Sequence, residues 1–261
     1  MDASRAAGVE ATWRDDGDLC LGSGDSLRDE QTVVLVRSKS YVRGPLVARM
    51  LEHAGARVVN RAGAASRCAD KLATLTALHD AGLPAVPFSL VLTRADLDRA
   101  VERLGLPLVI KPTHGGFGRR VLLVRQADLV HAVYDYVEHH GHGFDRALIA
   151  QPLVRGADVR AIAVHGRVVA AVERTPTGDW RANVAAGAAA RVRVPDERLT
   201  DLAVRVSDLL DLDLGGIDLF ATESGYLVSE VNHVPEFRAA TAATGVDIAA
   251  EIVAATLGSA S

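Results

Sequence analysis

Three oxygen-bearing side chains near the C-terminal end of the chain are spaced as a metal site on a β-hairpin requires. Asp218 and Glu230 stand in two runs in which apolar residues alternate with others, a pattern typical of paired strands. If residues 223–225 form a three-residue turn with Gly225 in the left-handed conformation, Asp218 faces Glu230 across the hairpin. Asn232, two residues beyond Glu230, then points the same way.

The same register pairs Thr222 with Tyr226 and puts Ile217 opposite Val231 on an apolar face. Opposed carboxylates destabilise a strand pair unless a cation or a proton lies between them, and three oxygen ligands suit Mg²⁺, with Mn²⁺ as a substitute. The prediction depends on turn length, because a two-residue turn would move Asp218 to the other face. An acid that only faces solvent is the alternative.

A lysine and a glycine-rich stretch indicate phosphate binding. Lys111 ends the apolar run 106–110 and precedes a loop, residues 113–120. A sheltered ammonium beside mobile backbone can neutralise phosphate, although a plain hairpin has the same pattern. Walker A and dinucleotide spacings are both absent, since those loops open a helix and this one joins two strands. The glycines of the loop are Gly115, Gly116 and Gly118.

Two arginines stand on consecutive strand-like segments. Across a hairpin, Arg160 and Arg174 could point into one cleft and bind carboxylate or phosphate oxygens; arginines at the surface ends of strands are the alternative. The histidine-rich stretch 139–142 follows a helix end, where imidazoles and glycine are common, so we do not expect it to bind metal. Cys68 is isolated, and we expect it to be packed and not nucleophilic.

The elements that must position these groups alternate between strands and helices, which favours α/β lobes. Strand 32–36, helix 44–54 and strand 57–60 form a βαβ unit, the remnant of a small Rossmann-like lobe. Further strands are expected at 106–111, 121–124, 146–151, 158–164 and 168–174, before the hairpin 216–232. Further helices are expected at 70–80, 94–104, 128–137, 196–210 and 246–257.

Composition narrows the class of protein. The chain has 261 residues, of which 49% are hydrophobic, and this is enough to form a sizeable core. Its formal charge of −4 gives it no bulk attraction to nucleic acid or anionic lipid. The two cysteines lie far apart, which fits a reducing cytoplasm. No segment has the length of a membrane span or the order of a signal peptide.

Taken in order, the segments resemble the RimK and LysX branch of the ATP-grasp ligases, from about Val33 to Ala255. The chain is most similar to the LysX type, which joins an amino acid to the C-terminal glutamate of a small acidic carrier protein. The most specific segment is Glu230 to Phe237. The others are Arg37 to Ser40, Arg43-Gly44, Val59 to Arg61, Cys68 to Thr74 and Ala81 to Pro84.

The resemblance implies an ATP-grasp fold of α+β lobes with a shortened, Rossmann-like pre-grasp lobe. Segment 1–30 is then irregular or degenerate, and 31–68 is the truncated pre-grasp lobe. Segment 69–150 is the central lobe with the phosphate loop, and 151–261 is the C-terminal lobe with the metal site. ATP would bind between the last two.

The resemblance also implies roles for individual residues. ATP contacts fall on Lys71, Lys111, Gly115, Gly116, Gly118, Gln151, Pro152, Leu153, Val154, Asp158, Arg181 and Asn183. The residues implied to bind Mg²⁺ are Asp218, Glu230 and Asn232. Those implied to bind the acyl phosphate or the substrate carboxylate are Arg160 and Arg174. Other substrate contacts are implied for His233, Glu236 and Phe237. Two residues depart from the pattern: Pro152 replaces a common acid, and Gly116 replaces a usual serine.

The implied activity is ATP-dependent amide formation through an acyl phosphate, with an amino acid as amine and an acidic carrier protein as acceptor. The implied protein is a cytoplasmic homo-oligomer, a dimer or tetramer. Two alternatives stay open: a RimK-like or natural-product peptide ligase that uses free amino acids, and a nucleotide-binding regulatory protein without catalysis. The second is suggested by the short first lobe and by Pro152.

Overall fold

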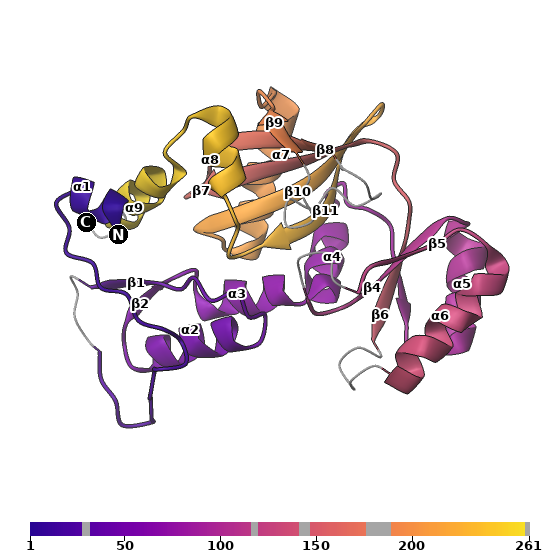
Figure 1. The fold of residues 1–261 in the computed structure, drawn as a ribbon, viewed down its shortest axis with the longest axis horizontal. Helices are drawn as coiled ribbons and strands as arrows, with labels where there is room; N and C mark the ends of the chain where they lie inside the picture. The colour runs from indigo at the N-terminus through magenta and orange to yellow at the C-terminus, as the bar shows by residue number, and fades with distance from the viewer. Residues whose placement is uncertain (28–31, 116–119, 141–146, 176–188, 259–261) are drawn as a thin grey trace.

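The computed structural model describes residues 1–27, 32–115, 120–140, 147–175 and 189–258. Its first lobe contains a parallel pair of strands, β1 (Val33–Leu35) and β2 (Arg57–Val59), joined by helix α2 (Arg43–His53). Ala48 and Leu51 of α2 pack against β2 and helix α3 (Ala62–Ala69). The predicted βαβ unit is confirmed. Helix α1 (Asp2–Ala6), which the sequence did not predict, lies beside the C-terminal helix (Figure 1).

Helix α4 (Lys71–Asp80) begins where an aspartate caps it. The Asp70 carboxylate accepts hydrogen bonds from the backbone N–H groups of Leu72 and Ala73 at 2.8 and 3.3 Å, which satisfies amides that the helix leaves free. Leu75 and Leu78 are buried in the core that also holds the five-stranded sheet. The cap therefore fixes Lys71 at the first position of the helix.

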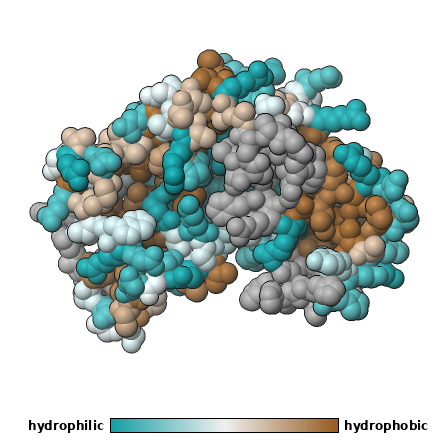
Figure 2. Space-filling view, viewed as in Figure 1, coloured by the Kyte–Doolittle hydropathy of each residue, from teal (hydrophilic) through white to brown (hydrophobic). Residues whose placement is uncertain are grey.

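A four-stranded antiparallel sheet forms the second lobe, on the right in Figure 1. Its strand order is β3 (Ser89–Val91), β6 (Leu148–Pro152), β4 (Leu108–Pro112) and β5 (Leu122–Val124). Helices α5 (Arg94–Leu104) and α6 (Ala127–His140) pack on one face. The capping box of Thr93 and Asp96 begins α5. Figure 2 shows apolar side chains gathered over this lobe, whose exposed members include Leu90, Leu92, Leu122, Leu129 and Tyr136.

A five-stranded antiparallel sheet forms the third lobe, with order β11-β10-β7-β8-β9. Its strands are β7 (Ala157–Val164), β8 (Arg167–Thr175), β9 (Ala189–Val192), β10 (Leu214–Thr222) and β11 (Gly225–Asn232). Helix α7 (Glu197–Leu210) packs with α4 on one face, and α8 (Arg238–Thr244) and α9 (Ile248–Gly258) cover part of the other. The expected boundary at 150 and 151 falls inside β6 of the four-stranded sheet.

Strand alternation places the charged residues of this sheet on one face. Val159 and Ala161 of β7 point toward α4 and α7, whereas Ile162 and Val164 point toward α8 and α9. Because side chains alternate along a strand, Arg160 shares the face of Ile162 and Val164. Apolar residues fill the helix-covered end of that face, and charged residues occupy its other end.

The hairpin of β10 and β11 confirms two predicted pairings, Asp218 with Glu230 and Ile217 with Val231, although its turn differs from the predicted one. Its turn has two residues, so Thr222 pairs with Gly225, and the predicted partner Tyr226 pairs with Ala221. A bulge at Ser229, between Val228 and Glu230, shifts the register by one residue. Asp218 therefore still lies opposite Glu230, so the predicted turn was wrong and the predicted pair of acids correct.

Among the described residues, no single helix has the length and apolar composition of a membrane span; α8 and α9 meet the criterion only as a pair bent by 110°.

Candidate active site

A cavity of about 1100 Å³ opens between the two sheets and the loop that follows β1. Most of the residues selected from the sequence line it; they come from helix α4 and from the second and third lobes. These are Lys71, Lys111, Gly115, Gln151, Pro152, Leu153, Val154, Asp158, Arg160, Arg174, Asp218, Glu230, Asn232, His233, Glu236 and Phe237. Four others, Gly116, Gly118, Arg181 and Asn183, lie outside the described residues.

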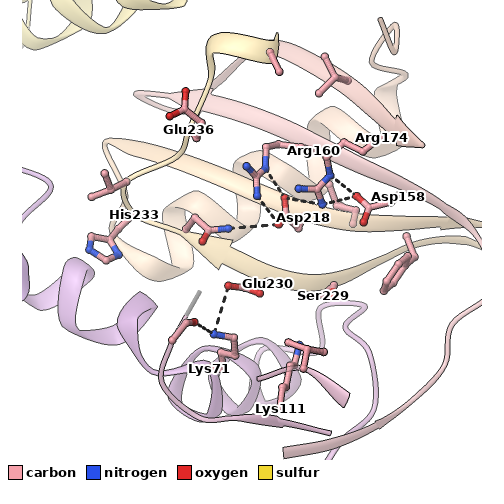
Figure 3. A pocket seen from close by; sticks show the side chains of 18 of the residues that line it. Lys71, Lys111, Asp158, Arg160, Arg174, Asp218, Ser229, Glu230, His233 and Glu236 are labelled. Carbon is pink, nitrogen blue, oxygen red and sulfur yellow. Dashed lines mark hydrogen bonds and ion pairs between the residues drawn. The ribbon is translucent and has the colours of Figure 1, made fainter. Parts of the chain in front are cut away.

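Lys71 joins three parts of the cavity wall. Its backbone N–H donates to the Thr113 carbonyl at 2.8 Å, and its ammonium donates to the Gly115 carbonyl. The ammonium also lies 3.5 Å from Glu230 Oε1 on β11 (Figure 3). The Lys71 ammonium therefore lies between the glycine-rich loop and the hairpin that carries the acids.

Lys111 projects from β4 toward the same space and is only 6% exposed. Burial lowers the pKa of its ammonium to about 8, although the nearby Glu230 carboxylate opposes the shift. A lysine held in this way gains a strong interaction when an anion enters the cavity, because the charge otherwise has little solvation. Phosphate is a suitable anion for such a point charge.

The segment that connects the two sheets closes one end of the cavity. The Gln151 side chain, 3% exposed, donates toward the Val86 carbonyl at 3.4 Å, and Leu153 N–H bonds to the Pro107 carbonyl at 3.0 Å. A side chain at Gly156 would place Cβ 2.6 Å from the Ala221 carbonyl oxygen, so only glycine lets the connection cross β10 this closely. An apolar slot edged by backbone amides suits a flat heterocycle.

Asp218 is the centre of a charged network on the five-stranded sheet. The Arg160 guanidinium donates to both of its carboxylate oxygens, at 2.7 and 2.8 Å, and Arg174 lies 3.4 Å away. Burial tends to raise the pKa of Asp218, but the two arginines hold it below its usual value. Arg174 also donates from Nε to Asp158 at 2.6 Å. Both arginines point into the cavity, as the hairpin argument suggested, and both are already paired.

The three expected metal ligands lie on one face of the hairpin. Asp218 and Glu230 are directly opposed, and Asn232 Nδ2 approaches Asp218 Oδ2 at 3.5 Å. Arg160 donates to both oxygens of the Asp218 carboxylate, and Arg174 and the Asn232 amide approach the remaining acceptor sites. A cation at Asp218 would therefore have to displace one of these contacts. No group of three His, Cys, Asp or Glu side chains in the described part of the chain has metal-site geometry, so the fit to Mg²⁺ requires the Asn232 oxygen.

The first lobe contributes side chains to which the sequence reasoning gave no role. Tyr41 donates its hydroxyl hydrogen to Asn232 Oδ1 at 3.1 Å, and its ring lies 5.5 Å from the Lys71 ammonium. Burial raises the pKa of Tyr41, and Glu230 and Asp218 raise it further, so the phenol stays protonated. The available signal was position, since loops at the carboxyl ends of parallel strands commonly line ligand sites.

His233 follows the hairpin and is buried, and its ring makes an edge-to-face contact with the half-buried Tyr41 ring, with centroids 6.2 Å apart. Burial lowers the pKa of His233 to about 4, and the neighbouring Arg37 guanidinium lowers it further. The imidazole is therefore neutral near pH 7.

Cys68 is buried as expected, and burial raises the pKa of its thiol to about 12, which makes it a poor nucleophile.

The charges around the cavity favour anionic ligands. Seven cationic and five anionic side chains line it, an excess of two positive charges with His233 neutral. Such a surface suits a polyphosphate together with carboxylates. Lys71 and Lys111 form one cationic group beside the glycine-rich loop, and the acids of the hairpin lie between them and the paired arginines (Figure 3).

Comparison with known proteins gives a consistent result. The model of the RimK-like ATP-grasp domain matches residues 68–256. The glutamate–LysW ligase ArgX of Sulfurisphaera tokodaii is 31% identical over 226 residues, which are 85% of this chain and 80% of the relative. The α-aminoadipate–LysW ligase LysX of Sulfolobus acidocaldarius is 32% identical over 229 residues, 84% of this chain and 80% of the relative.

Solved structures share the fold. The RimK domain ATP-grasp protein of Sphaerobacter thermophilus superposes with a TM-score of 0.82 at 25% identity, over 97% of this chain and 92% of the other. The ATP-grasp ligase PsnB, solved with a minimal precursor, Mg and ADP, superposes with a TM-score of 0.74 at 22% identity, over 100% of this chain and 92% of the other. The predicted ATP-grasp fold is confirmed.

Proposed function

The chain belongs to the RimK-like ATP-grasp family, and we propose that it is an ATP-dependent ligase that joins an amino acid to the terminal carboxylate of an acidic carrier protein. Two of the relatives named above are LysW ligases. The carrier-protein acceptor and the identity of the amino acid are the finer parts of this proposal.

One observation carries the proposal: two lysines, a pair of opposed acids and two arginines meet in one cavity beside the glycine-rich loop. Lys71 and Lys111 supply charge for phosphates, and Gln151 to Val154 form the edge on which an adenine would rest. The grouping has the donors and acceptors that phosphoryl transfer to a carboxylate needs. No protein nucleophile is required.

Each group of residues has a distinct task in this reaction. The two lysines neutralise the phosphates of ATP, and Arg160 and Arg174 stabilise the acyl phosphate while their own carboxylate partners keep them aligned. Asp218, Glu230 and Asn232 would hold Mg²⁺, which supplies positive charge against the charge that develops during transfer. Attack of the amine on the acyl phosphate then forms the amide and releases phosphate.

Experiment separates this proposal from two alternatives. A ligase of free amino acids would use the same cavity, since nothing in the reaction requires a protein acceptor. A regulatory protein without catalysis would retain the cavity but release no ADP. Homo-oligomerisation and a cytoplasmic location stay predictions.

The test is ADP release by the purified protein with ATP and Mg²⁺, measured with glutamate and with α-aminoadipate, each with and without a carrier domain that ends in glutamate. We expect release that requires both the amino acid and the carrier. Mass spectrometry of the carrier should show the added residue.

Lys111→Met is the matched inactive variant, because it removes a charge but keeps the apolar stem. We expect its turnover to fall at least about a hundredfold with unchanged thermal unfolding. Equal ADP release with and without the carrier would support the free-amino-acid ligase. Nucleotide binding without any amino-acid-dependent release would favour the regulatory protein.

A further inference from the structure

Unpartnered polar atoms line the cavity, and most of them belong to Arg37 and His233. Among the described residues, seven buried side-chain nitrogen or oxygen atoms have no hydrogen-bond partner. Four of the seven belong to residues that line the cavity: Arg37 Nη1, Arg174 Nη1 and both ring nitrogens of His233. Buried polar groups in folded proteins are nearly always paired, so this grouping indicates that a ligand supplies the missing partners.

Arg37 differs from the two arginines that are paired inside the cavity. Arg160 and Arg174 form ion pairs with Asp218 and Asp158. Arg37 forms no ion pair with any described residue; its one hydrogen bond runs from Nη2 to the Pro235 carbonyl at 2.8 Å. Arg37 is half-buried and its Nη1 is enclosed; burial lowers the pKa of Arg37, and the Glu236 carboxylate opposes the shift. A guanidinium withdrawn from water without an ion-pair partner is a site for an anion.

The Arg37 guanidinium is also held in a defined position. It stacks 5.2 Å from the centre of the Phe237 ring while donating to Pro235. The segment that carries Pro235 is also held in place, because Pro235 packs closely on Gly216. A Cβ atom added to Gly216 would lie 2.7 Å from the Pro235 Cβ. Asn60 further holds the His233 carbonyl through a bond of 2.7 Å. Arg37 and His233 are thus both preorganised.

This cluster lies away from the groups that would activate a carboxylate. In Figure 3, His233 lies beyond Glu230 on the left, whereas Arg174, Asp158 and Lys111 lie on the right. A ligand held by Arg37 and His233 would therefore place its anionic end on the side of the acids opposite Arg174.

We propose that Arg37 and His233 form the subsite that binds the unreacted carboxylate of the incoming amino acid. This inference rests on the proposed function, since only the amine substrate brings a carboxylate that the reaction leaves intact beside the reacting amine. The guanidinium donates two hydrogen bonds to the carboxylate, and one of the unpartnered His233 ring nitrogens donates a third. Specificity for acidic amino acids or for α-carboxylates then originates in the first lobe.

The test is calorimetric binding of glutamate and α-aminoadipate to the protein saturated with Mg²⁺ and a non-hydrolysable ATP analogue. Arg37→Gln removes the charge but keeps an N–H donor for the Pro235 carbonyl. We expect it to weaken binding of these amino acids at least about 30-fold, with Arg37→Lys intermediate. The matched control is Arg43→Gln, which removes an arginine of the same lobe that lies outside the cavity and pairs with Asp16; it should bind as the wild type does.

Amide analogues identify the carboxylate. Glutamate α-amide lacks the α-carboxylate, and glutamine lacks the side-chain carboxylate. If Arg37 binds a given carboxylate, the amide that lacks it should bind to the wild type and to Arg37→Gln with equal affinity. The inference is overturned if the variant weakens glutamate and both amides by the same factor, if Arg43→Gln has the same effect, or if the wild type binds neither amino acid. Failure of the proposed function has a different result: Arg37-dependent binding without any ADP release.

Discussion

At the scale of single residues, the buried ammonium of Lys111 makes ligand binding sensitive to pH. Lys111 is buried in a cavity with excess positive charge, and burial lowers its pKa to about 8. The free protein therefore begins to lose this charge just above neutral pH. A bound phosphate raises the pKa again, because it favours the charged form.

We expect ADP binding to take up a proton above pH 8. Below pH 7 the ammonium is charged with and without ligand, so no uptake is expected; near pH 9 it is neutral when free and charged when bound. Calorimetry in buffers of different ionisation enthalpy measures the uptake. Lys111→Arg is the control, since arginine stays charged and should bind ADP without uptake. The same uptake in both proteins would refute the assignment.

At the scale of elements, two features align groups that no single strand could align. The bulge at Ser229 restores the pairing of Asp218 with Glu230 after the two-residue turn has shifted it. Asn60, which follows β2, donates to the carbonyls of Leu214 and His233 at 2.7 Å each and accepts from Leu214 N–H at 2.8 Å. The Asn60 side chain of the first lobe thus makes the backbone hydrogen bonds that a neighbouring strand would make to the third lobe.

Asn60→Ala should destabilise the protein by about 3 kcal/mol, because it leaves three buried backbone groups without partners. Urea unfolding measures the change. Ser66→Ala is the control: it also removes a buried polar side-chain atom, but one without a partner, and should change stability by less than about 0.5 kcal/mol. Equal effects of the two substitutions would show that Asn60 does not hold the lobes together.

At the scale of the whole molecule, the mouth of the cavity determines which acceptor can reach it. Lys39 and Arg238 are exposed and line the cavity, whereas Arg160 and Arg174 are paired inside it. The exposed cations are therefore the ones available to attract an acidic partner from solution.

We expect kcat/KM for a carrier domain that ends in glutamate to exceed that for free glutamate at least about a hundredfold, or about 2.7 kcal/mol. Only the carrier rate should fall as salt rises, because surface charges are screened. Reversing both mouth charges, Lys39→Glu with Arg238→Glu, should lower kcat/KM for the carrier and leave that for free glutamate unchanged. Indifference of the carrier rate to salt and to charge reversal would contradict the carrier proposal.

The sequence by itself determined the elements and the residue types of the site. Alternation, the Asp70 cap and the capping box of Thr93 are local, so strands, helix starts and the faces of side chains follow from neighbouring residues. The order of the motifs determined the family and the ATP-grasp fold. Short elements such as α3, β3 and α8 were missed because tertiary packing, and not a local pattern, stabilises them.

Only the tertiary structure decided which charges are already satisfied and which await a ligand. Arg160 pairs with Asp218 across two strands of one sheet, whereas the bonds from Tyr41 to Asn232 and from Arg37 to the Pro235 carbonyl join the first lobe to the third. Asn60 meets its partner Leu214 across 154 residues of sequence. No local pattern specifies such contacts, because they arise when three lobes pack around one cavity and burial makes each unpaired charge costly.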